Sequence, residues 1–196
     1  MRTSRTRAYP VRTPRTRSRS PIDGYKPFVD DELQHLRVEY AGRGFAAADA
    51  GDDPMALFAA WFREAARSDA VVEPNAMTLA TVAADGTPSA RMVLLKGVDA
   101  PRAAFRWYTN LASRKARESS DSGTAAACWW WPGAPGRQVR AIGTVHHVSR
   151  DDAATYFATR PHAAQVGAIA SRQSRAAASR VDIDARAMAV GDAGDL

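Results

Sequence analysis

The chain has 196 residues, enough for one domain with a buried core, and its formal net charge of +6 stems from its first 20 residues, which hold seven arginines and no acid. The remaining 20 basic and 21 acidic residues nearly cancel, so the body of the protein is not expected to bind nucleic acid. A single cysteine excludes an internal disulfide, and no apolar run is long enough to cross a membrane, which together favour the cytoplasm.

Residues 1–21 come first in chain order and are predicted to be a disordered, arginine-rich tail. The run MRTSRTRAYPVRTPRTRSRS has no apolar period and few large side chains that would offset the entropy of ordering. Its composition also resembles that of a transit peptide or a nucleic-acid-binding arm, and these alternatives stay open beside a plain solvated extension.

Two helices are predicted before the first strand. Residues 30–40 (DDELQHLRVEY) indicate a short helix, and residues 54–67 indicate an amphipathic helix. Asp53 is the expected cap of this second helix, and Pro54 suits its first position. Its apolar stripe consists of Leu57, Phe58, Trp61, Phe62 and Ala65.

From Ala76 the apolar period changes to that of strands. Residues 76–83 and 88–98, joined by the turn pair Asp85-Gly86, predict a hairpin, and residues 104–110 predict a third strand. Residues 124–131 and 137–148 predict another pair, separated by the breaker-rich sequence PGAPG. An antiparallel sheet is therefore expected.

The remaining helices are predicted around this sheet. Ser113 is the expected cap of a short helix over residues 113–119, and Ser149 with Asp152 has the form of a capping box that opens a helix through Phe157. A further short helix follows from Pro161 toward residue 170, and residues 175–196 have only weak helical character. The order of elements predicts the α+β class with a barrel-like sheet, not alternating strands and helices.

The chain has no glycine-rich phosphate loop, so a bound phosphate would have to be held by side chains. The predicted sheet and the helix after it carry a concentration of cations, namely Arg91, Lys96, Arg114, Lys115, Arg137 and Arg140. The backbone of residues 92–95, if it lies at a sheet edge, can hydrogen-bond a planar heterocycle. A plain core strand is the alternative for these four residues.

Other candidate site residues give weaker signals. His146 and His147 are adjacent on a predicted strand and must point to opposite faces, so they are not expected to share a metal. The run of tryptophans at 129–131 would stack on a ring, or form core or a subunit contact. Cys128 is predicted to be a small buried hydrophobe.

Seven segments occur in an order that closely resembles the pyridoxamine/pyridoxine 5'-phosphate oxidase family: EPNAMTLATV (73–82), DGTPSARMVLLKG (85–97), WYTN (107–110), SRKARE (113–118), RQVR (137–140), YFATRP (156–161) and SRQS (171–174). The resemblance spans about residues 36–174. It implies an FMN-binding split β-barrel with flanking helices over residues 22–174, and a homodimer that binds flavin mononucleotide (FMN) between its subunits.

The resemblance also implies site residues. FMN binding is carried onto Arg91, Met92, Val93, Leu94, Leu95, Lys96, Tyr108, Thr109, Arg114, Lys115, Gln138, Gln173 and Ser174. Substrate binding is carried onto Arg37, Tyr40, Lys96, Tyr156 and Arg160. The implied reaction moves a hydride from C4' of pyridoxine or pyridoxamine 5'-phosphate to the flavin, which dioxygen then reoxidises, and the product is pyridoxal 5'-phosphate.

The sequence departs from the family pattern in two places. The family has a serine shortly after its R-P pair, where this chain reads Arg160-Pro161-His162-Ala163-Ala164. The family pattern continues beyond the SRQS motif with a tryptophan and an R-L-H-D-R type motif, whereas no tryptophan follows Trp131 here and residues 175–196 are atypical. These departures predict a shortened oxidase with weakened activity. A non-catalytic FMN- or pyridoxal-phosphate-binding protein, and a split-barrel flavin or deazaflavin reductase of another substrate, are the alternatives.

Overall fold

The computed structural model describes residues 44–133 and 136–191, all of which fall within the compact unit Tyr40–Leu196. Two helices open it, α2 (Ala47–Ala50) and α3 (Pro54–Ala66). The carboxylate of Asp53 accepts hydrogen bonds from the backbone N–H groups of Met55 (2.8 Å) and Ala56 (3.2 Å), which confirms the predicted cap. The tail at 1–21 and the helix predicted over 30–40 lie outside the described residues.

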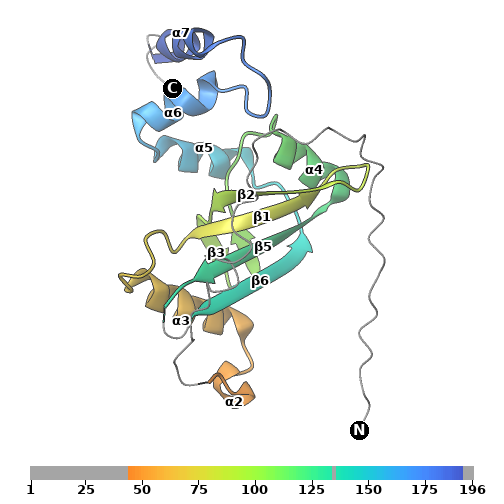
Figure 1. The fold of residues 1–196 in the computed structure, drawn as a ribbon, viewed down its shortest axis with the longest axis vertical. Coiled ribbons are helices and arrows are strands. Elements are labelled where there is room, and N and C mark those ends of the chain that lie inside the picture. Colours follow the sequence, from red (N-terminus) through yellow and green to blue (C-terminus); the bar gives the residue numbers. More distant parts are fainter. Residues whose placement is uncertain (1–43, 134–135, 192–196) are drawn as a thin grey trace, which may run out of the picture. The chain divides into compact units, whose positions relative to one another are not determined.

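The centre of the fold is a four-stranded antiparallel sheet in the order β2-β1-β5-β6 (Figure 1). Its strands are β1 (Ala76–Val82), β2 (Pro88–Leu94), β5 (Thr124–Trp131) and β6 (Arg137–Thr144). A separate two-stranded ladder joins β3 (Gly97–Asp99) to β4 (Ala104–Arg106). The predicted α+β class is confirmed, and β2 lies at an edge of the larger sheet.

The strand predicted over 88–98 is wrong as one element, because the chain changes partner within it. The Leu95 N–H still bonds the carbonyl of Asn75 (2.8 Å), whereas the Lys96 N–H bonds the carbonyl of Arg106 (2.8 Å). From that point the ladder continues against β4. The strand predicted over 104–110 is likewise shorter, since β4 ends at Arg106 and Asn110 already belongs to the turn that precedes Ser113.

The strand predicted over 137–148 is also too long. Thr144 at the end of β6 pairs with Thr124, the first residue of β5, so no backbone of β5 remains to pair with residues beyond it. His146 and His147 therefore lie after the strand, and His146 instead shares a hydrogen bond of 3.1 Å with the hydroxyl of Thr144. Among the described residues, no cluster of histidine, cysteine and acidic side chains has the grouping of a metal site.

One face of the sheet carries the core, on which α3 packs. Phe58 of α3 contacts the ring of Trp129 edge-on at 5.2 Å and that of Trp131 at 5.7 Å, and Met77 is fully buried beside them. Side chains alternate along β5, so Trp129 is 0% exposed whereas Trp130, between the two buried tryptophans, is 49% exposed. The tryptophan run thus divides between the two faces.

The opposite face, here called the outer face, carries several exposed apolar side chains in the described part of the chain. The register places its side chains opposite one another across all four strands. Met92 is 62% exposed and Ile142 is 84% exposed. Its apolar side chains include Ala80, Met92, Ala126, Trp130 and Ile142, and the polar side chains of Thr78, Gln138 and Arg140 lie among them.

Four helices accompany the strands: α4 (Arg114–Ser122) precedes β5, and α5 (Arg150–Ala158), α6 (His162–Ala170) and α7 (Arg180–Gly191) follow β6. Ser113 and Ser149 cap α4 and α5 as predicted. The expectation of weak helical character after residue 175 underestimates α7, which has an ion pair between Asp182 and Arg186 at 2.8 Å. No described helix combines the length and apolar character that crossing a membrane requires.

Candidate functional site

The amino end of α4 carries an unusual charge pattern. Its first turn contains Arg114 and Lys115 and no acidic residue. A helix amino end has a partial positive charge and normally attracts acidic side chains, so two cations there oppose the helix dipole. An anion bound at this end would be stabilised by the helix dipole and by both side chains.

A segment from far along the chain docks on this helix end. The Ser174 hydroxyl accepts a hydrogen bond from the Arg114 N–H (3.0 Å), and the Lys115 ammonium donates to the Gln173 side-chain oxygen (2.9 Å). Ser174 has φ of 66°, a left-handed conformation that is uncommon for a residue other than glycine. Such strain persists only where surrounding contacts hold it, and it concentrates at functional sites. The structure thus brings these four predicted residues together.

Arg91 reaches the same region from β2. Its Nη1 donates to the carbonyl of Leu79 (3.1 Å) and to the hydroxyl of Thr81 (2.5 Å), and its Nη2 contacts the hydroxyl of Ser89 and Oε2 of Glu118 (3.3 Å). Its side chain is 21% exposed. Arg91 is therefore held by the sheet and by α4 together.

Glu118 is the functional candidate that sequence reasoning missed. Its side chain is buried, and Oε1 accepts from Nε of Arg114 (2.6 Å) while Oε2 accepts from the hydroxyls of Thr81 and Ser89 (2.5 Å each). The one available signal was its spacing, four residues after Arg114 on a predicted helix. One carboxylate therefore joins two of the predicted cations.

The electrostatics of the cluster favour an anionic ligand. Burial lowers the pKa of Lys115, and the nearby positive charge of Arg91 lowers it further. Hydrogen bonds from Ser89 and Thr81 lower the pKa of Glu118 to about 2, with a further contribution from Arg114. Glu118 is thus ionised at neutral pH, and the three cations still exceed it in charge.

This pKa predicts an acid-dependent loss of stability. The carboxyl of Glu118 has an ordinary pKa of 4.5 when unfolded and about 2 when folded, so the folded chain holds this proton more weakly. The stabilisation is fully present above about pH 4.5 and declines as the pH falls toward about 2. We expect urea unfolding between about pH 6 and pH 3 to show a steeper decline for the wild type than for Glu118→Gln. Equal slopes for the two proteins would contradict the assignment.

Two predicted tyrosines also meet. The rings of Tyr108 and Tyr156 stack at 3.8 Å with an interplanar angle of 5°, which places α5 beside the segment that follows β4. The hydroxyl oxygen of Thr109 lies 3.5 Å from that of Ser113, the cap of α4. Arg160 lies after α5, with its guanidinium 5.7 Å from the ring centre of Phe157.

Other predicted residues do not join this cluster. Gln138 on β6 pairs with Trp130, so its side chain belongs to the outer face, whereas Arg91 lies on the opposite face of the sheet with Thr81 and Ser89. Arg140 pairs with Cys128 and also belongs to the outer face. The side chain of Lys96 is exposed. Arg37 and Tyr40 lie outside the described residues.

The edge of β2 offers backbone groups instead of side chains. Ladder bonds of an antiparallel pair alternate, and the bonds from Leu95 N–H to Asn75 and from Ala83 N–H to Thr87 show that the odd-numbered residues of β2 face β1. The N–H and carbonyl groups of Met92 and Leu94 therefore point away from the sheet. The predicted contact with a planar heterocycle would use these groups.

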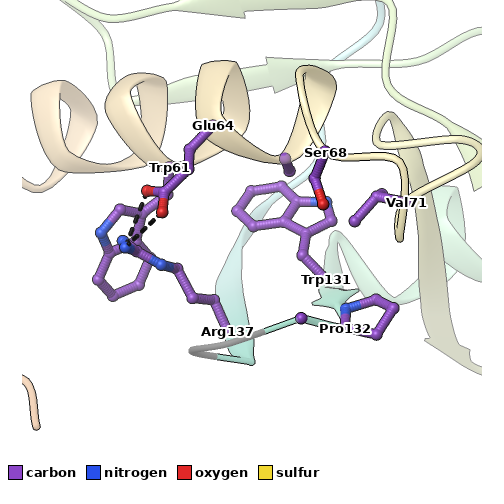
Figure 2. A pocket seen from close by; sticks show the side chains of 9 residues that line it. Trp61, Glu64, Ser68, Val71, Trp131, Pro132 and Arg137 are labelled. Carbon is purple, nitrogen blue, oxygen red and sulfur yellow. Dashed lines mark hydrogen bonds and ion pairs between the residues drawn. The ribbon is translucent and has the colours of Figure 1, made fainter. Parts of the chain in front are cut away.

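A shallow pocket lies elsewhere, between α3 and the turn that joins β5 to β6 (Figure 2). There Nη2 of Arg137 pairs with Oε2 of Glu64 at 2.8 Å, and the guanidinium lies 4.6 Å from the centre of the Trp61 ring. Arg137 therefore lies apart from the cluster that contains Arg91, Arg114 and Lys115. The residues that line this pocket include none of the predicted cofactor or substrate contacts.

Comparison with known proteins assigns the family. Residues 63–192 match the family model described as Pyridoxamine 5'-phosphate oxidase. The pyridoxine/pyridoxamine 5'-phosphate oxidase of Rubrobacter xylanophilus is 46% identical, over 79% of this chain and 70% of that protein. The protein of the same name from Salinibacter ruber is 47% identical, over 78% of this chain and 69% of that one.

A solved structure confirms the fold. PhzG from Burkholderia lata 383, in complex with tetrahydrophenazine-1-carboxylic acid, matches with a TM-score of 0.72 and 24% sequence identity. The match covers 80% of this chain and 76% of PhzG. At this identity the likeness concerns the fold alone.

Proposed function

The chain belongs to the pyridoxamine 5'-phosphate oxidase family, and on this basis we propose that it oxidises pyridoxine or pyridoxamine 5'-phosphate to pyridoxal 5'-phosphate with FMN and dioxygen. The family assignment supports an oxidoreductase that uses FMN. The observation that carries the proposal is the convergence of Arg91, Arg114, Lys115 and Ser174 at the amino end of α4.

The residues present fit FMN. A phosphate monoester suits a helix amino end with two adjacent cations, and the exposed backbone edge of β2 suits the polar rim of a flavin ring. Arg114 and Lys115 would hold the phosphate directly, Arg91 would add positive charge behind them, and Met92 and Leu94 would orient the ring. When bound, FMN supplies the hydride acceptor, and the chain's own contribution is to position two rings and two phosphates.

We assign the substrate phosphate to Lys96, Tyr156 and Arg160. Two cations and a phenol suit a phosphomonoester, and the stacking of Tyr156 on Tyr108, a predicted FMN contact, supports this assignment. His162, which stands near the place of the family's serine, is exposed at the start of α6. Arg37 and Tyr40 stay proposals that rest on the resemblance.

We further propose a homodimer with FMN between the subunits. The outer face exposes large apolar side chains, among them Met92, Trp130 and Ile142, as surfaces that bind other proteins often do. Gln138 and Arg91 lie on opposite faces of one sheet, so a single FMN that contacts both would need Arg91 from one chain and Gln138 from another. We propose that a second copy packs on the outer face and supplies this Gln138.

A non-catalytic FMN-binding protein is the second candidate, because the alanines after His162 stand where the family has a phosphate-binding serine. Loading the protein with FMN and adding pyridoxine 5'-phosphate without oxygen separates the two. We expect the flavin absorbance to bleach and to return when oxygen is admitted, with pyridoxal 5'-phosphate as product.

Three controls make this experiment decisive. Bleaching by dithionite shows that the bound flavin is reducible, and Arg160→Ala should raise the concentration of pyridoxine 5'-phosphate required for bleaching. A reducible flavin that no B6 phosphate bleaches would favour binding without catalysis. Bleaching by tetrahydrophenazine-1-carboxylic acid alone would assign the chain a different substrate.

A further inference from the structure

Glu118 is a buried acid beside an anion site, which is a costly arrangement. A negative charge near a phosphate weakens phosphate binding by direct repulsion, and a buried carboxylate must be compensated by hydrogen bonds and cations. Here the compensation is complete, because two hydroxyls and two arginines meet its oxygens. The carboxylate of Glu118 therefore holds those two arginines in place.

The contacts of Glu118 divide the roles of the two arginines. Arg114 is 52% exposed and is held through Nε alone, so its two terminal nitrogens make no hydrogen bond with a described residue and retain four donor hydrogens. Arg91 has both terminal nitrogens engaged and is only 21% exposed. The two terminal nitrogens of Arg114 can thus donate to a ligand from a fixed position. Arg91 contributes a second positive charge next to them.

The charges of the cluster also match the ligand. Arg91, Arg114 and Lys115 contribute three positive charges and Glu118 one negative charge, so the cluster has a net charge of +2. A phosphate monoester carries about −1.5 to −2 at neutral pH. Without Glu118, the site would hold a third uncompensated cation and an Arg114 side chain free to change rotamer.

We propose that Glu118 is a positioning residue that fixes Arg114 and Arg91 for the phosphate of FMN, an inference that rests on the proposed function. The direction in which Glu118→Gln changes the affinity for FMN tests this proposal. If charge alone mattered, Glu118→Gln would bind FMN more tightly, because one negative charge is lost. If positioning dominates, the same variant binds FMN more weakly, by about tenfold.

The measurement compares FMN with riboflavin, which has the same ring and no phosphate, by fluorescence titration of the apoprotein. Weaker binding of FMN with unchanged binding of riboflavin supports the proposal. Glu118→Asp, which keeps the charge but shortens its reach to Arg114, is expected to bind FMN more weakly than the wild type. A folded Glu118→Gln protein that binds FMN as tightly as the wild type, or more tightly, overturns the proposal.

Glu64→Gln is the matched control, because it makes the same chemical change in another glutamate that pairs with an arginine, Arg137 (Figure 2). This variant should leave the affinities for FMN and riboflavin unchanged. If Glu118→Gln does not fold, Ser89→Ala removes one hydrogen bond to the carboxylate and should weaken FMN binding selectively, and an unchanged affinity would overturn the proposal. A wild type that fails to bind FMN refutes the proposed function and this inference together, whereas an FMN-binding wild type with an unaffected Glu118→Gln refutes the inference alone.

Discussion

Replacing Arg114 and Lys115 together with alanine is expected to lower the affinity for FMN by about a hundredfold or more. Each charge-assisted hydrogen bond contributes about 1.5 to 3 kcal/mol, so the loss of two corresponds to about 3 to 6 kcal/mol. Both side chains lie in the first turn of α4, and the helix dipole alone cannot replace them. Quenching of flavin fluorescence in a titration of the apoprotein measures the effect.

The control for this double variant removes two cations from elsewhere. Arg102 and Arg180 form exposed ion pairs, with side chains 82% and 84% exposed, and their joint replacement by alanine changes the net charge equally. Exposed pairs contribute about 0 to 1 kcal/mol to stability, so this protein should fold and bind FMN normally. Equal losses of FMN affinity in both double variants would show that overall charge, not the α4 site, binds the cofactor.

Replacing Ile142 with aspartate is expected to dissociate the proposed homodimer. Ile142 is 84% exposed on the outer face, and in a symmetric dimer each copy would bring one unpaired carboxylate into the interface. We expect the dimer dissociation constant to rise by at least about a hundredfold, equivalent to about 3 kcal/mol. Sedimentation velocity measures the change, and FMN binding should fall with it because Gln138 would no longer reach the cofactor.

Val72→Asp provides the comparison, because Val72 is 99% exposed and lies in the loop between α3 and β1, outside the outer face. This variant should keep both its oligomeric state and its FMN affinity. A monomeric wild type, or an Ile142→Asp protein that remains dimeric, would show that the outer face is not the subunit interface. Full FMN affinity in a monomeric variant would show that Gln138 is dispensable.

Features encoded by neighbouring residues could be predicted from the sequence. The cap at Asp53 with Pro54, the turn at Asp85-Gly86 and the cap at Ser113 each depend on residues a few positions apart. The alternation of β5 follows from the strand period, but which tryptophans face the core does not. That choice depends on where α3 packs, and no local signal gives it.

Features that depend on distant partners could not be predicted in this way. The strand over 88–98 has no breaker at residues 95 and 96, and it divides only because Arg106 offers a new partner. The docking of Ser174 on Arg114 joins residues that are 60 positions apart in the chain. The family resemblance named both residues, yet their contact and the role of Glu118 emerge only in three dimensions.

The partner change at residues 95 and 96 has a consequence for how the protein opens. Leu95 is bonded to the four-stranded sheet and Lys96 to the β4 strand of the smaller ladder, so one peptide link couples two hydrogen-bonded units. Because adjacent residues make these two bonds, we expect the two units to open together. Amide hydrogen exchange at Leu95 and Lys96, corrected for their different intrinsic rates, should therefore give one common opening free energy, and the backbone that adjoins the proposed flavin edge would open with them.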